Sequence, residues 1–64
     1  MTLEQIKSAT DLTTAVHFLC DNKDALRQSG EFITYTFAIA ARATKINVSP
    51  DALDQIADEY LKNK

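Results

Sequence analysis

The sequence predicts an all-α fold, a compact bundle of three to four short helices formed by a single domain over residues 1–64. Apolar residues recur at helical spacing through most of the chain. Gly30 and Pro50 are its single glycine and single proline, whereas hairpins and tight turns depend on these residue types. The hydrophobic content of 45% is ordinary for a folded domain and too high for a disordered tail. The strongest predicted helices span about residues 11–21, 31–44 and 50–62.

The opening segment "MTLEQIKSA" predicts a short helix, because Thr2 and Gln5 have the spacing of a capping box. Hydroxyl side chains then weaken helical structure locally, so we expect a break or bend near residues 8–11. The alternative to this break is a single helix that runs through both segments and is buried on two sides. Helical spacing resumes in the second segment, whose apolar positions are Leu12, Ala15, Val16, Leu19 and Cys20.

The segment "DNKDALRQSG" contains a restart signal. Asp21 or Asn22 is able to cap a short turn that runs through Arg27. Gly30 suits the left-handed position that closes a helix. We therefore expect a short separate turn between the second helix and the third.

The segment 32–37 has the β-branched and aromatic composition of a strand. Its one candidate pairing partner, "KINV" at 45–48, is very short. Four alanines lie in residues 38–43 and are strong helix formers, so we favour a helix over residues 31–44. Its apolar arc is broad, which predicts a central helix covered by several neighbours. The arc comprises Phe32, Ile33, Thr36, Phe37, Ile39, Ala40 and Ala43, and the narrower opposite side comprises Glu31, Thr34, Ala38, Ala41 and Arg42.

The last helix has the clearest start signal. Ser49 is the predicted N-cap, Pro50 takes the first helical position, and Asp51 falls in the first turn. Val48 and Leu53 have the spacing of a hydrophobic staple. The segment predicts a surface helix with an apolar stripe and an acidic outer face.

Few residues suggest chemistry. His17 and Cys20 lie one helical turn apart, and Asp21 and Asp24 follow. Ligands from one helix leave a metal site open, and no second cluster completes it. As a nucleophile pair, His17 and Cys20 lack an orienting third group and a cleft. We therefore expect no catalytic residues, no metal and no cofactor, and we interpret Cys20 as a small buried residue and His17 as half exposed.

Charge and hydropathy constrain the partners. The net charge is −2, and the seven basic residues are scattered rather than clustered, which argues against nucleic-acid binding. A helix-turn-helix over residues 39–56 would present the acidic segment "SPDALDQIADEY" to DNA. No apolar run approaches the roughly 20 residues of a membrane span. Without a signal-peptide pattern, we expect a cytoplasmic protein.

A chain this short usually needs help to stay folded, and a single cysteine excludes an internal disulfide. We therefore expect a non-catalytic protein-interaction module with a regulatory role, bound to another protein or to a second copy of itself. A small dimeric DNA-associated regulator is the alternative. The candidate partner-binding residues are Tyr35, Phe37, Asp51, Asp54, Asp58 and Tyr60. The three aromatic side chains among them would also fit a small core, and the three acids would also fit a solvated helix face.

Phe18, the run Asp24–Ala25–Leu26 and the segment "AARATKINVSPDAL", which ends at Leu53, carry one resemblance. From Phe18 to Leu53 the layout resembles a small helical domain family associated with nitrogen-fixation gene clusters. Members of that family also serve as leader segments of ribosomally made peptide precursors. Thr44 stands where the family has glycine, and Lys45 looks like an insertion. The resemblance implies a helical domain that is recognised by another protein, such as a modifying enzyme.

Overall fold

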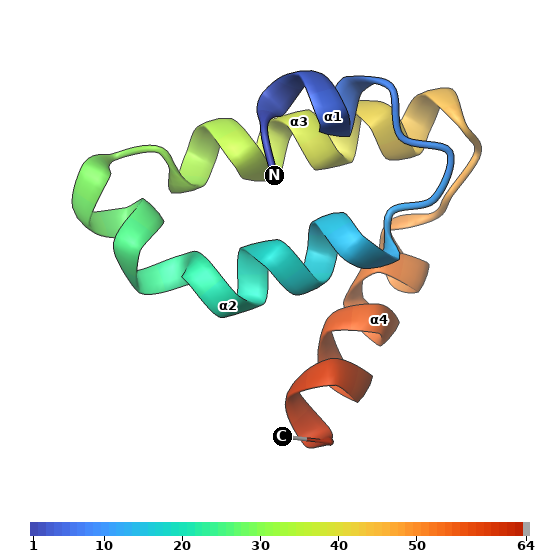
Figure 1. Cartoon of the computed structure of the whole chain (residues 1–64). Coiled ribbons are helices and arrows are strands. Elements are labelled where there is room, and N and C mark those ends of the chain that lie inside the picture. The colour runs from blue at the N-terminus through green and yellow to red at the C-terminus, as the bar shows by residue number, and fades with distance from the viewer. Residues whose placement is uncertain (64) are drawn as a thin grey trace.

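The computed structural model describes residues 1–63, and within them the chain forms four helices and no strand (Figure 1). The predicted all-α bundle is therefore confirmed. The helices are α1 (Leu3–Lys7), α2 (Thr13–Ser29), α3 (Phe32–Lys45) and α4 (Pro50–Lys62).

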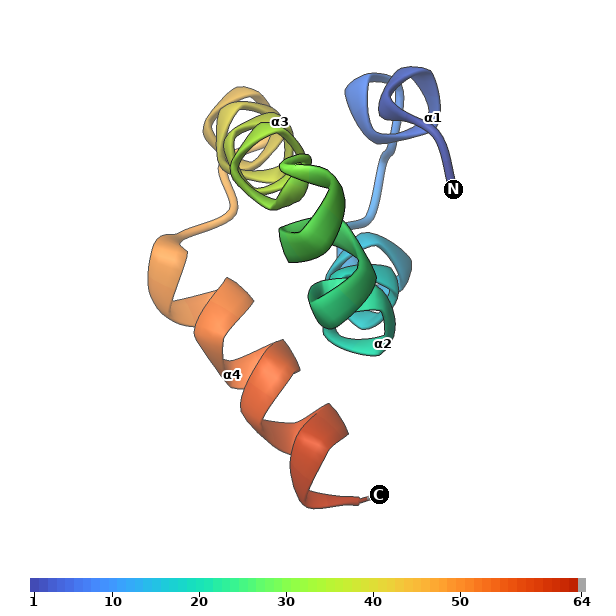
Figure 2. The same cartoon turned by 90° about the vertical axis from the view of Figure 1, so that its left-hand side faces the viewer.

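The two longest helices, α2 and α3, form an antiparallel pair that is joined by a tight turn (Figure 1). α1 packs against α3, and α4 packs against α2 and descends away from α3 (Figure 2). The principal-axis extents are 30 × 27 × 16 Å. A helix with its side chains is about 10–12 Å across, so the molecule is thin in one direction. Few positions in such a thin bundle can be enclosed on all sides.

The core lies where α1, α2 and α3 meet. Ile6 of α1 and Leu12, just before α2, are essentially inaccessible to solvent. They pack with four further buried residues, and α4 adds half-buried side chains along one edge of this cluster. Burial of apolar side chains is the main source of stability here. The further buried core residues are Ala15, Val16, Ile39 and Ala43.

α1 has the predicted capping box. The Gln5 amide N–H donates to the Thr2 hydroxyl oxygen at 3.3 Å, and the Thr2 amide N–H donates to the Gln5 side-chain oxygen at 2.8 Å. The helix ends after Lys7, so the predicted break near residues 8–11 is confirmed. The break lets Ile6 and Leu12 enter the same core from two directions.

α2 is longer than predicted. It begins at Thr13 and continues without interruption through Ser29, so the expected separate turn after Asp21 is wrong. The Asn22 side chain does not cap a new turn, because its amide donates to the Phe18 carbonyl oxygen one turn back at 2.9 Å. Leu26 is buried and anchors the added turns.

Both ends of the α2–α3 pair close through left-handed residues. Gly30 has φ 78° and closes α2, and the Glu31 amide donates back to the Leu26 carbonyl at 2.9 Å. Asn47 has φ 60° after α3, and the Val48 amide donates to the Ala43 carbonyl at 2.8 Å. Glycine and asparagine are the residues that tolerate this conformation best.

α4 forms as predicted. The Ser49 hydroxyl accepts a hydrogen bond from the Ala52 amide at 3.2 Å, and Pro50 occupies the first helical position. Val48 and Leu53 both pack against the core cluster. None of the α4 residues is fully buried, so this helix lies on the edge of the bundle.

Candidate protein-interaction surface

The outer side of α3 carries an exposed apolar face. Ile33 and Phe37 lie one helical turn apart, and their side chains are 65% and 69% exposed. Ala40, Ala41 and Thr44 continue this face toward the end of the helix, and all three are exposed. We call these five residues the α3 stripe. An exposed pair of large apolar side chains on a small protein is typical of an interaction site.

The exposure of the α3 stripe corrects the prediction of a central helix whose broad apolar arc is covered by several neighbours. The Arg42 guanidinium Nε donates to the Ala9 carbonyl oxygen at 2.7 Å, so the chain following α1 lies over the side of α3 that was expected to face outward. Ile33, Phe37 and Ala40 belong to the predicted buried arc but remain exposed. Figure 2 looks nearly along α3 and shows α1 on one side of it and α2 and α4 below it.

A hollow lies at the N-terminal end of the α3 stripe. Phe32, Ile33, Thr36 and Phe37 line it, and its volume is about 290 Å³. The Arg27 guanidinium lies over the Phe32 ring, 4.7 Å from its centroid. This contact brings the end of α2 against the start of α3 at one side of the hollow.

Tyr35, a predicted binding residue, lies on the opposite side of α3 from Phe37. It is half buried, its ring packs against the core, and its centroid is 5.4 Å from that of Phe18. Of the two candidate aromatic residues on this helix, Phe37 therefore remains available to a partner, while Tyr35 contributes to the core.

Tyr60 joins α4 to α2. Its ring stacks on the His17 ring with centroids 4.0 Å apart and planes 17° from parallel. Its hydroxyl donates to the Asp21 carboxylate, with oxygen distances of 2.8 and 2.7 Å to Oδ1 and Oδ2. Both the face and the tip of Tyr60 are thus engaged within the molecule, so its side chain holds two helices together.

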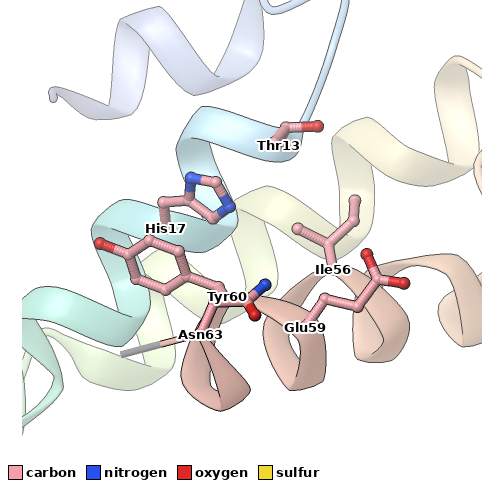
Figure 3. A pocket seen from close by; sticks show the side chains of 6 residues that line it. All are labelled: Thr13, His17, Ile56, Glu59, Tyr60 and Asn63. Carbon is pink, nitrogen blue, oxygen red and sulfur yellow. The ribbon is translucent and has the colours of Figure 1, made fainter.

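A shallow hollow of about 360 Å³ adjoins this contact. Figure 3 shows the His17 ring over the Tyr60 ring on one side of the hollow and Ile56 and Glu59 on the other. Among residues 1–63, no three His, Cys, Asp or Glu side chains gather closely enough to hold a metal ion. Cys20 is half buried and packs against the core. The hollow is lined by Thr13, His17, Ile56, Glu59, Tyr60 and Asn63.

The predicted acidic face of α4 is exposed. Asp51, Asp54 and Asp58 all point to solvent. Asp54 also lines a hollow of about 190 Å³ whose other wall includes Thr36 and Ala40 of α3. This acid therefore lies close to the α3 stripe, and it is the acidic residue that a partner seated on the stripe would meet first.

Two features of the surface were not expected from the sequence. The first is the exposure of Ile33, which was predicted to lie in the core. Ile33 lies one helical turn before Phe37, and this spacing is visible in the sequence. Lys7, Arg42 and Lys45 come from two helices and line one hollow of about 260 Å³ together with alanines of α3. The sequence alone did not reveal this cluster of positive charge, because Lys7 is far from Arg42 and Lys45 in the sequence. The cluster forms only because α1 packs against α3.

Within residues 1–63 no helix has both the length and the apolar character that crossing a membrane requires. Comparisons of the chain with protein-family models, with curated proteins and with solved structures find no match. The resemblance to the leader-type helical family thus stays a prediction.

Proposed function

We propose that the protein is a small non-catalytic interaction module with a regulatory role in the cytoplasm, and that it binds a protein partner through the α3 stripe. The observation that carries this proposal is the exposure of Ile33 and Phe37 side by side, at 65% and 69%. Large apolar side chains at the centre of a contact supply most of the binding free energy in protein interfaces. The acidic face of α4 would form the polar rim.

Small size supports the proposal from a second direction. A 64-residue chain buries a smaller share of its surface than a larger domain does, and its stability is correspondingly marginal. Exposing two large apolar side chains adds nothing to folding, and it favours association. A partner that covers the stripe would therefore stabilise the folded state.

Site-specific photo-crosslinking tests this function in cells. A photoreactive phenylalanine analogue replaces Phe37 in one variant and Lys23, which is exposed on α2, in the control. We expect a discrete protein adduct from position 37, and we expect the adduct to disappear when Ile33→Ser is added. Equal labelling at both positions, or no adduct at position 37, would contradict the proposal.

One observation favours a second candidate, a small dimeric DNA-associated regulator. Lys7, Arg42 and Lys45 gather at one hollow, and DNA binding depends on such clusters. A gel-shift titration at low salt separates the two functions. DNA binding that weakens steeply as salt rises would support the regulator, and its absence would remove it.

A further inference from the structure

We propose that the α3 stripe binds an amphipathic helix of another protein, and that this helix carries basic side chains along one edge of its apolar face and acidic side chains along the other. This inference rests on the proposed function and adds the chemistry of the partner. Two hollows border the stripe, one with an acid and the other with a cluster of bases. The apolar surface alone does not identify a partner, whereas the charges on its two sides do.

An acid borders the stripe on the side of α4. Ala40 of the stripe and Asp54 of α4 line the same hollow of about 190 Å³. The exposed Asp54 carboxylate has no hydrogen bond or ion pair within residues 1–63. Lys23 follows Leu19, another lining residue of this hollow, by one turn of α2, and it does not pair with Asp54. The negative charge of Asp54 is therefore available to a base of the partner.

Bases border the other side of the stripe. Ala41 of the stripe lines a hollow of about 260 Å³ with Lys7, Arg42 and Lys45. Within residues 1–63, no carboxylate forms an ion pair with any of these three bases. Lys7 and Lys45 lie in the last turns of α1 and α3, where they also offset the helix dipoles. That role leaves both lysines exposed, so they can pair with acids of a partner.

The acid and the bases lie on different sides of the stripe. In the view along α3 of Figure 2, α1 and α4 flank this helix in different directions and leave its outer side open. Lys7 comes from α1, and Asp54 comes from α4. Ala40 and Ala41 are consecutive, and consecutive residues of a helix point about 100° apart. A segment lying along the stripe therefore meets negative charge at one edge and positive charge at the other, at the same level of α3.

The shape of the stripe fits a helix. From Ile33 to Thr44 it extends about 16 Å along α3, which is three turns. The alanines in its C-terminal half let a second backbone approach closely, while Phe37 projects between the side chains of the partner. An amphipathic helix presents apolar side chains at such a spacing and polar ones along both edges. Its basic edge would lie toward α4 and its acidic edge toward α1.

A second copy of the chain does not match both the size and the charge of this surface. With the two α3 helices antiparallel, large side chains would lie opposite small ones, but the twofold axis would bring Asp54 toward Asp54 of the second copy. With the helices parallel, acid would meet base, but Phe37 would meet Phe37 and hold the alanines apart. A different chain escapes this conflict, because symmetry does not couple its side-chain sizes to its charges.

Binding of designed peptides to the full chain tests the charge pattern. Two synthetic helical peptides share one composition and a leucine–alanine face. The segregated peptide has lysines along one edge and glutamates along the other, and the mixed peptide has both residue types along both edges. We expect the segregated peptide to bind at least about threefold more tightly at low salt, with a smaller advantage at high salt. Equal affinities of peptides with equal helix content would overturn the inference.

Charge reversal on the protein tests the two sides of the stripe separately. Asp54→Lys should weaken binding of the segregated peptide by about threefold to tenfold and strengthen binding of a peptide with glutamates along both edges. Lys45→Glu should also weaken binding of the segregated peptide, and it should strengthen binding of a peptide with lysines along both edges.

Glu59→Lys and Lys62→Glu are the matched controls for these two variants. Each changes the net charge as much as the variant that it matches. Glu59 lines the hollow beside His17, on another side of α4 from Asp54. Lys62 lies in the last turn of α4, as Lys45 does in α3, so both substitutions oppose a helix dipole. Controls that shift the affinities equally would reduce the effect to net charge and overturn the inference.

The outcomes separate this inference from the proposed function. If the photoreactive residue at position 37 captures a protein and the adduct persists in Asp54→Lys and Lys45→Glu, the interaction module stands and the charge-patterned helix is overturned. An adduct of the chain with its own copy has the same consequence. No adduct at position 37 would overturn both. An adduct with another protein that both charge variants reduce, together with tighter binding of the segregated peptide, would support both.

Discussion

Gly30 and Asn47 hold the left-handed backbone conformations that end α2 and α3. A Cβ atom at Gly30 would meet no neighbouring atom within 4 Å, so the cost of a side chain there comes from the backbone alone. Gly30→Ala is expected to lower the free energy of unfolding by about 1 kcal/mol. Urea denaturation measures this loss.

Gly30→Asn is the matched comparison, because asparagine adopts the left-handed conformation more readily than alanine. Gly30→Asn should therefore lower the free energy of unfolding by less than Gly30→Ala does. Equal stability of Gly30→Ala and the unchanged protein would mean that the turn relaxes out of its left-handed conformation at no cost.

Asp11 holds the start of α2. Its carboxylate accepts hydrogen bonds from the Thr13 amide at 2.9 Å and the Thr13 hydroxyl at 2.8 Å. The backbone hydrogen bond first, and the hydroxyl second, lower the pKa of Asp11 below its usual value of 3.8. Because the folded-state pKa is lower, this stabilisation is present above about pH 4 and is lost as the pH falls through the folded-state pKa.

Asp11→Asn should therefore destabilise the protein at neutral pH, and the difference from the unchanged protein should narrow below about pH 4. Urea denaturation at a series of pH values checks the trend. Asp24→Asn, an exposed change on α2 away from this cap, is the control and should show no such narrowing. A constant difference at every pH would mean that the charge of Asp11 does not act in the cap.

At the scale of the helices, Tyr60 is one of the side chains that join α4 to α2. Tyr60→Phe keeps the ring that stacks on His17 but removes the hydrogen bonds to Asp21. We expect a loss of about 1 kcal/mol in the free energy of unfolding, with unchanged helix content. Thermal and urea unfolding followed by circular dichroism measure it.

Tyr35→Phe removes a hydroxyl from a different helix and serves as the control for Tyr60→Phe. If both variants lose the same stability, the Asp21 contact has no special part in holding α4. If Tyr60→Phe alone is destabilised, the hydrogen bonds from the Tyr60 hydroxyl to Asp21 stabilise the contact between α2 and α4.

The helices also show which helix boundaries can be predicted from the sequence. α4 was predicted from Ser49 and Pro50, because a cap and a first-turn proline act within one turn and need no tertiary contact. α2 was predicted too short, because Asn22 has two possible hydrogen-bonding roles. Burial of Leu26 against the rest of the fold favours the continuous helix, and that burial is not visible in a local pattern.

For the whole molecule, the sequence predicted the fold class but misplaced part of the core. The apolar arc of α3 is correct as a pattern, yet Ile33 and Phe37 lie outside the core. Which part of an arc is covered depends on where α1 and α4 come to rest, and neither position follows from the periodicity of α3. Of the predicted partner-binding residues, Phe37 and the acids of α4 remain exposed, while Tyr35 and Tyr60 are half buried.

The position of α4 at the edge of the bundle implies that the molecule does not open all at once. α4 contributes no fully buried residue, whereas Ile6, Leu12 and their neighbours lie among the other three helices. Backbone amides of α4 should therefore exchange with deuterium through partial detachment of this helix, faster than the central amides of α2. Hydrogen-exchange mass spectrometry reads the order directly, and uniform protection of both helices would show one cooperative unit. Such detachment would expose the side of α4 that packs against the core, with Leu53, Ile56 and Ala57, whereas the acidic face of α4 is exposed in either state.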